Sequence, residues 1–306
     1  MAIQPLFNKT LDAVGPFAKD LDRVVTHPKV TLPAKDAPDT SLTIFTPKDA
    51  PGEPLAGSHS LRPLVLWIYG GGWVAGASGQ IAVHTKVLTA QGFTVAALDY
   101  TLAPAQKYPT PIRQTATALD YLLAHASQYG ADPTRVFIAG DSVGSQIASQ
   151  VAAMVTNTGF SRQVGIDTKF PAGNLRGAIL YCGPCNVATV GATGFPGIRT
   201  FLWSYTGYRD YLSAPRIHEL STVHYATSNY PPTYLTVGDG DWFESQAREF
   251  EGVLRSHHVA VTSRYWTGSG RKLLHEYQFK LNTEPGRVAL SDIIQFIKRN
   301  AQGNAR

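Results

Sequence analysis

Short apolar runs alternate with helix-patterned segments through most of the chain. Runs rich in apolar residues predict buried strands at 64–69, 93–98, 135–139, 177–181, 233–237 and 259–266. Apolar residues that recur every three or four positions predict helices at 115–129, 146–155, 242–254 and 288–297. Strands this apolar, separated by helices, indicate an α/β fold in which helices cover both faces of a mostly parallel sheet.

Two segments depart from this alternation. Residues 5–25 carry apolar residues at helical spacing, interrupted at Gly15-Pro16, and predict two short helices. Residues 186–230 are rich in aromatic residues and show little strand pattern. Both segments are candidates to pack over the carboxyl ends of the strands, where ligands bind in open α/β sheets. The stretch 46–63, rich in Pro, Gly and Ser, predicts a surface loop within a single domain over 1–306.

Composition and charge exclude several classes of protein. The 306 residues are 43% hydrophobic and 16% charged, which is typical of a globular chain with a sizeable core. The net charge of +5 comes from scattered basic residues, so we expect no nucleic-acid partner. No apolar run approaches the roughly 18 residues of a membrane span. The N-terminus lacks the pattern of a signal peptide, and we expect a cytoplasmic protein.

The sequence Gly-Asp-Ser-Val-Gly at 140–144 lies between a predicted strand and a predicted helix. A nucleophile elbow has this placement, because its glycines allow the sharp turn that presents the serine at the tip of the sheet. The helix N-terminus behind Ser142 also stabilises negative charge. A glycine-rich turn with a capping serine is the alternative interpretation.

A serine nucleophile needs a base, and in this class of fold the base comes last in the chain. His275 lies beyond the final predicted strand and before the closing helix, where that base is expected. We favour it over the other downstream histidines, which are His218, His224, His257 and His258.

The acid that orients the base is expected after an earlier strand. Asp239 and Asp241 both follow the strand predicted at 233–237. Asp241 precedes Trp242-Phe243, which would fix it against the next helix, so it is the favoured acid and Asp239 the second candidate. Capping of the helix at 242–254 is the structural alternative for either residue.

Three glycines follow the strand at 64–69, between Tyr69 and Trp73. Glycines let main-chain N–H groups approach a substrate closely, and preorganised N–H groups stabilise a developing oxyanion. The run is not a phosphate-binding loop, because no Gly-Lys-Ser/Thr follows it.

The only two cysteines form Cys182-Gly-Pro-Cys185. The spacing matches a redox pair, but the pair follows an apolar strand and does not open a helix, so we interpret it as two small, partly buried thiols at the end of a core strand. Two sulfurs alone do not make a zinc site, and no metal or cofactor is expected.

These motifs, in this order, resemble those of the hormone-sensitive-lipase-like esterases, including the bacterial group IV carboxylesterases. The resemblance covers Gly70-Gly71-Gly72-Trp73, Asp99-Tyr-Thr-Leu-Ala-Pro104, the elbow at 140–144, Asp241 and His275. It implies an α/β-hydrolase fold with a helical cap, here from 1–40 and 186–230. It also implies a catalytic Ser142, His275 and Asp241, and an oxyanion hole from the N–H groups of Gly71, Gly72 and Val143.

The chain departs from the family pattern at several positions. Tyr69 stands where the family usually has His, and Ser145 where it has a second glycine. Thr101, Ala105 and Gln114 replace residues that are usually charged, which predicts neutral contacts in place of an ion pair. None of these positions performs chemistry.

We therefore expect a carboxylic-ester hydrolase that acts on short to medium acyl esters through an acyl-enzyme. Tyr69, Trp73 and Trp203 are the candidate substrate-binding residues. A homodimer is compatible with the sequence. The alternatives are a non-catalytic small-molecule receptor on the same fold, and an amidase or deacetylase with the same triad.

Overall fold

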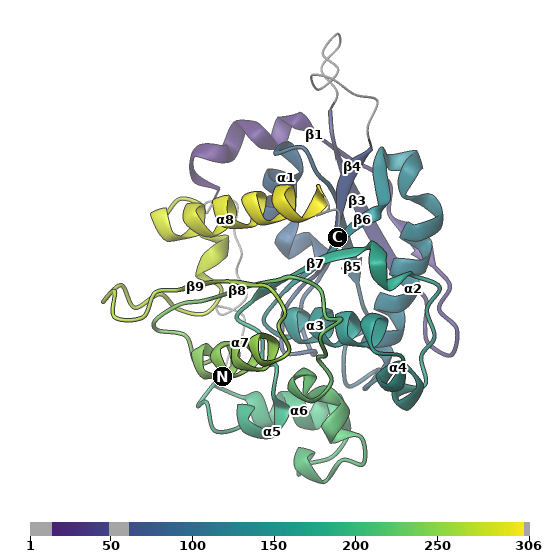
Figure 1. Ribbon diagram of the computed structural model, residues 1–306, viewed down its shortest axis with the longest axis vertical. Helices are drawn as coiled ribbons and strands as arrows, with labels where there is room; N and C mark the ends of the chain where they lie inside the picture. Colours follow the sequence, from purple (N-terminus) through teal and green to yellow (C-terminus); the bar gives the residue numbers. More distant parts are fainter. Residues whose placement is uncertain (1–13, 49–60, 303–306) are drawn as a thin grey trace.

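The computed structural model describes residues 14–48 and 61–302. Their strands form one sheet in the order β1-β3-β5-β4-β6-β7-β8-β9, and β2 pairs with β3 (Figure 1). The strands are β1 Val24–Thr26, β2 Val30–Leu32, β3 Thr40–Pro47, β4 Arg62–Ile68, β5 Thr94–Asp99, β6 Ala131–Asp141, β7 Leu175–Tyr181, β8 Thr233–Val237 and β9 Val261–Tyr265. Pairing is parallel from β5 to β9 and antiparallel where β3 meets β1, β2 and β5.

Helices cover both faces of the sheet (Figure 1). On one face lie α1 Ala82–Ala90 and α8 Glu284–Ala301, and on the other lie α2 Thr110–His125, α3 Val143–Thr156 and α7 Glu244–Ser256. Shorter elements are α4 Thr158–Val164, α5 Val187–Val190, α6 Ile198–Thr206, and the 3-10 turns η3 Gly15–Arg23, η4 Ser78–Ile81, η5 Ala126–Tyr129, η6 Ala172–Asn174, η7 Tyr211–Ser213, η8 Ile217–Leu220, η9 Thr222–His224 and η10 Tyr277–Phe279.

The core lies on both sides of the central strands. The side chains of Leu66 in β4 and Ile138 in β6 are completely buried. On the α8 face, the Phe137 ring of β6 meets Phe296 of α8 with ring centroids 6.1 Å apart. Because the central strands are parallel, their carboxyl ends lie along one edge of the sheet.

The strands and helices predicted from the alternation are confirmed, with ends that differ by a few residues. The strands of the antiparallel side, β1 to β3, and helices α1 and α4 were not predicted. Strands β1 and β2 have only three residues each, too few for a periodic pattern to identify.

The structure corrects part of the predicted cap. Helical turn η3 packs against α1, and β1 and β2 join the sheet, so residues 15–32 do not lie with 186–230. Val24 and Leu32 bury their side chains in the core through this pairing. The first helix predicted in 5–25 and residues 49–60 of the predicted loop lie outside the described residues. In the ranges 14–48 and 61–302 no helix is long and apolar enough to cross a bilayer.

Candidate active site

Ser142 occupies the sharp turn between β6 and α3. Its φ of 52° and ψ of −124° lie in a region that non-glycine residues rarely adopt. Close packing fixes this conformation, because a Cβ on Gly144 would lie only 2.1 Å from the carbonyl oxygen of Ile68 at the end of β4. The Ser142 N–H also donates to the Tyr181 carbonyl at 2.8 Å. The turn has the backbone geometry of a nucleophile elbow.

A chain of hydrogen bonds runs from Ser142 to the other two predicted residues. The Ser142 Oγ lies 2.9 Å from His275 Nε2, and His275 Nδ1 lies 2.9 and 3.1 Å from the two carboxylate oxygens of Asp241. In the neutral imidazole, the nitrogen that faces two carboxylate oxygens carries the proton, so Nε2 is the acceptor and the Ser142 hydroxyl donates to it. Three residues spread over 133 positions of sequence thus meet as predicted.

The Asp241 carboxylate also controls the charge of His275. Burial by itself lowers the pKa of His275, whereas Cys182 and Asp241 beside the ring raise it, and the net pKa lies well above its ordinary value. Burial raises the pKa of Cys182 to about 11, so its thiol is uncharged near neutral pH. The Asp241 carboxylate is therefore the anion that favours the imidazolium there.

Asp239, the second candidate acid, has a different place. Its carboxylate accepts hydrogen bonds from the Leu273 N–H at 2.7 Å and the Ser269 hydroxyl at 2.9 Å, and these bonds lower its pKa. It therefore organises the loop that leads to His275. The other downstream histidines, His218, His224, His257 and His258, make no described hydrogen bond through their side chains to Ser142 or Asp241.

The loop after β4 is tied to the elbow by Asp141, which is completely buried. Its carboxylate accepts the Gly70 N–H at 2.9 Å and the Trp67 Nε1–H at 2.9 Å. Gly71 has a φ of 125°, and a Cβ there would lie 2.0 Å from the Ala75 carbonyl oxygen. The N–H groups of Gly71, Gly72 and Val143 donate to no acceptor among the described residues.

Two of the predicted substrate-binding residues are packed into the protein. Tyr69 stacks on Tyr100 with centroids 4.5 Å apart, and each hydroxyl donates to the other residue's carbonyl at 3.3 Å. Trp73 is fully buried, donates from Nε1 to Gln146, and stacks on Tyr205 of α6. Trp203, also on α6, is 47% exposed. Contact of these three with a substrate stays a prediction.

Two of the three positions where neutral contacts were predicted, Thr101 and Gln114, bond to each other. Gln114 accepts the Thr101 N–H at 2.8 Å and donates to the Thr101 hydroxyl at 2.7 Å. The Ser145 hydroxyl donates to the carbonyls of Gly140 and Tyr181, which closes the turn behind the nucleophile.

Aromatic side chains of the 186–230 segment lie at the site. The Phe195 ring meets His275 edge-on with centroids 5.1 Å apart. Phe243, which lies outside the segment and two residues after Asp241, also meets the His275 ring edge-on, at 5.2 Å. The Phe201 ring lies against Gly72, 2.9 Å from where a Cβ would stand. The sequence predicted an aromatic segment near the strand ends, but it did not single out these three rings.

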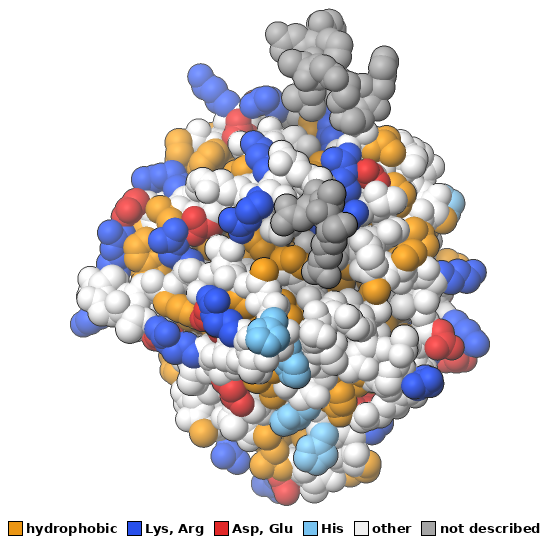
Figure 2. Space-filling view, in the orientation of Figure 1, with side chains coloured by type: hydrophobic (Ala, Val, Ile, Leu, Met, Phe, Trp, Pro, Cys, Tyr) orange, Lys and Arg blue, Asp and Glu red, His pale blue; other side chains and the backbone are white. Residues whose placement is uncertain are grey.

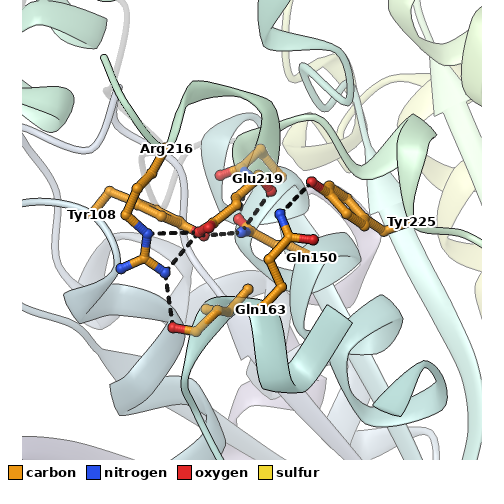
Figure 3. A network of polar contacts seen from close by, with 8 residues as sticks. Tyr108, Gln150, Gln163, Arg216, Glu219 and Tyr225 are labelled. Atoms are coloured by element: carbon orange, nitrogen blue, oxygen red, sulfur yellow. Dashed lines mark hydrogen bonds and ion pairs between the residues drawn. The ribbon is translucent and has the colours of Figure 1, made fainter. Parts of the chain in front are cut away.

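Polar contacts fasten the same segment to α3 and to the chain before α2 (Figure 3). The Glu219 carboxylate accepts from the Tyr108 hydroxyl at 2.8 Å and pairs with Arg216 at 2.7 Å. The Gln150 side chain of α3 donates to the Tyr108 hydroxyl and the Glu219 carbonyl. An open hollow lies beside this network and is lined in part by Tyr108, Tyr208 and Arg216. Ser142, Asp241 and His275 are not among its lining residues.

Two side chains at the site were not predicted to have a role there. Cys182 follows β7 with a φ of 41°, and its sulfur lies close to His275 and Asp241. Glu276, directly after His275, is buried with its carboxylate near Gly70. Both cysteines are free thiols, as predicted, and they are more deeply buried than expected. On the face shown in Figure 2, Lys and Arg are spread widely over the surface and form no single patch.

The strand order and the serine elbow define an α/β hydrolase, with the site at the carboxyl ends of the strands. The family described as having the alpha/beta hydrolase fold matches residues 65–275. The chain belongs to this family, in its hormone-sensitive-lipase-like branch, and it is an enzyme of the hydrolase class.

Known relatives agree with this assignment. An alpha/beta hydrolase of Acanthamoeba polyphaga mimivirus is 25% identical over 92% of this chain and 75% of its own length. Esterase LipI of Mycobacterium tuberculosis is 32% identical over 52% of this chain and 53% of its own. The crystal structure of esterase B from Lactobacillus rhamnosis superposes with a TM-score of 0.76 at 20% identity, covering 92% and 87% of the two chains, which shows a shared fold.

Proposed function

We propose that this protein is a carboxylic-ester hydrolase in which Ser142, His275 and Asp241 form a catalytic triad. The observation that carries the proposal is the continuous hydrogen-bond chain from the Ser142 hydroxyl through both nitrogens of His275 to Asp241. A serine hydroxyl is a weak nucleophile unless an adjacent base removes its proton, and this geometry supplies the base and its orienting acid.

The first half-reaction acylates the enzyme. His275 Nε2 takes the Ser142 proton while Oγ attacks the ester carbonyl, and Asp241 stabilises the imidazolium that forms. The imidazolium then gives its proton to the leaving alcohol. Water enters, loses a proton to His275 and attacks the acyl-enzyme, which releases the acid and restores Ser142.

The N–H groups of Gly71, Gly72 and Val143 would stabilise the oxyanion of both steps. Their lack of acceptors among the described residues supports this role, since oxyanion donors must be available when charge develops. The bond from Gly70 to Asp141 holds the first two relative to the elbow, so no reorganisation is needed during the reaction.

Segment 186–230 is the proposed cap, and it favours short to medium acyl chains. Phe195 and Phe201 stand beside His275 and Gly72, where they narrow the space next to the reacting carbon. These rings suit a small apolar acyl group, because a long chain would need them to move.

A substrate panel tests the proposal. The wild type is assayed on p-nitrophenyl esters from acetate to dodecanoate, and on the p-nitroanilides of the same acids. We expect fastest hydrolysis of short to medium esters and much slower cleavage of the anilides. Preference for anilides would favour an amidase or deacetylase, and binding of esters without turnover would favour a receptor.

A further inference from the structure

A third residue with metal-binding chemistry lies beside the base and its acid. Ligand atoms of Cys182, Asp241 and His275 all lie within 4.8 Å of one another. Cys182 comes directly after β7, and its positive φ of 41° is a conformation rare for a residue with a side chain. Its side chain is 1% exposed, so the sulfur is held beside the other two groups and away from solvent.

The three donors form a recognised set for zinc. Thiolate sulfur, imidazole nitrogen and carboxylate oxygen bind Zn²⁺ at about 2.0–2.3 Å in a tetrahedron, with water free to take the fourth position. The ligand atoms of such a tetrahedron stand roughly 3.3–3.8 Å apart, which small side-chain rotations reach from the present spacing. One thiolate and one carboxylate cancel the two charges of the ion, so the loaded site is neutral and its burial is much less costly.

We propose that Cys182, Asp241 and His275 form a binding site for a thiophilic divalent cation such as Zn²⁺, and that occupancy inhibits the enzyme. His275 uses Nδ1, the nitrogen that faces Asp241. Binding to the enzyme with neutral His275 releases one proton to solvent, from the Cys182 thiol, while the imidazole proton moves from Nδ1 to Nε2 and Asp241 binds as its carboxylate.

Occupancy would remove the base without touching Ser142. A neutral imidazole whose Nδ1 binds a metal keeps its proton on Nε2, and Nε2 is the atom that must accept the Ser142 proton. This consequence rests on the proposed function, whereas the binding of the metal does not. The two parts are therefore measured separately.

Cobalt tests the site directly, because a thiolate bound to Co²⁺ gives a charge-transfer absorption in the near ultraviolet. The chain has only two cysteines, and Cys185 is a matched control, being equally buried and free. We expect the band in the wild type and in Cys185→Ser, and its absence in Cys182→Ser and Cys182→Ala. No band in the wild type, or a band that survives in both Cys182 variants, would overturn the proposal.

Inhibition by Zn²⁺ tests the consequence. The hydrolysis rate of each variant with Zn²⁺ is divided by the rate of the same variant without metal, on a p-nitrophenyl ester. Chelation of the zinc by EDTA should restore the metal-free rate. Cys182→Ser loses the sulfur ligand, so its zinc inhibition constant should rise at least about tenfold. Cys185→Ser keeps the ligand, so its zinc inhibition constant should change less than about twofold. Equal inhibition of both variants would contradict the site. A wild type that shows the cobalt band but hydrolyses no ester would support the metal site and refute the esterase proposal.

Discussion

Ser142 is held in its unusual conformation by the residues around it. The closest of these contacts joins Gly144 to the end of β4, where there is no space for a side chain. The backbone strain at Ser142 therefore depends on packing between two neighbouring strand ends.

Replacing Gly144 by Ala is expected to destabilise the protein by about 2 kcal/mol or more and to abolish activity, because a Cβ there would stand 2.1 Å from a carbonyl oxygen. Urea unfolding and ester hydrolysis measure the two effects. Gly252→Ala in α7 is the control, since a Cβ there meets nothing within 4 Å, and it should be neutral or stabilising. Equal stability of the two variants would contradict the account of the elbow.

The charge of Asp241 should determine the pH profile. Hydrolysis needs neutral His275, so kcat/KM rises with pH through the His275 pKa, which lies well above the ordinary histidine value. Asp241→Asn removes the anion that raises this pKa, so the acid limb should move to lower pH while kcat falls roughly 10⁴-fold.

Asp239→Asn provides the comparison for this profile. Its carboxylate holds the loop before His275 and does not contact the ring, so the acid limb should stay in place. A shift of equal size in both variants would show that loop order, and not the charge beside the ring, determines the pKa.

Helix α6 is part of the proposed cap and packs against residues 70–73, the loop after β4 that carries two of the proposed oxyanion donors. Its Tyr205 stacks on Trp73, and its Phe201 lies against Gly72. Trp203 stands on the same helix but is 47% exposed. The helix therefore offers a buried ring and an exposed ring for comparison.

Phe201→Ala should shift the preferred acyl chain toward longer esters, because it opens space beside Gly72, a proposed oxyanion donor. The ratio of kcat/KM for octanoate to that for acetate measures the shift, with a change of about tenfold expected for a few methylenes gained. Trp203→Ala should change the ratio less. A larger effect at Trp203 would support direct substrate contact by that residue and contradict this description of α6.

Most elements could be predicted from the sequence because the central strands are buried on both faces and read as continuous apolar runs. The proximity of Ser142, Asp241 and His275 could be predicted because strand ends converge at one edge of a parallel sheet, so Asp241 and His275 had only a few competitors. Phe195, Phe201 and Cys182 could not, since their importance depends on how loops between strands fold back. Strands β1 and β2 were too short to show a period.

Over the whole molecule, the part of the core on the α8 face of the sheet contains none of Ser142, Asp241 and His275. Phe296 of α8 packs against Phe137 and Tyr234, on the face opposite α3. Phe296→Ala should cost about 3–5 kcal/mol of unfolding free energy while the folded fraction keeps its kcat. Lys298→Ala, exposed on the same helix, should cost under about 0.5 kcal/mol. Loss of kcat in folded Phe296→Ala would show that packing on the α8 face is coupled to the proposed catalytic site.

The most direct measurement of the central claim is covalent labelling by a p-nitrophenyl alkylphosphonate, followed by mass spectrometry of the intact chain and its tryptic peptides. The account predicts one adduct per chain on Ser142, within peptide 136–162, with release of one p-nitrophenol. Ser142→Ala should take up none, and His275→Ala should react far more slowly. An adduct on another residue, or equal labelling of Ser142→Ala, would contradict the account.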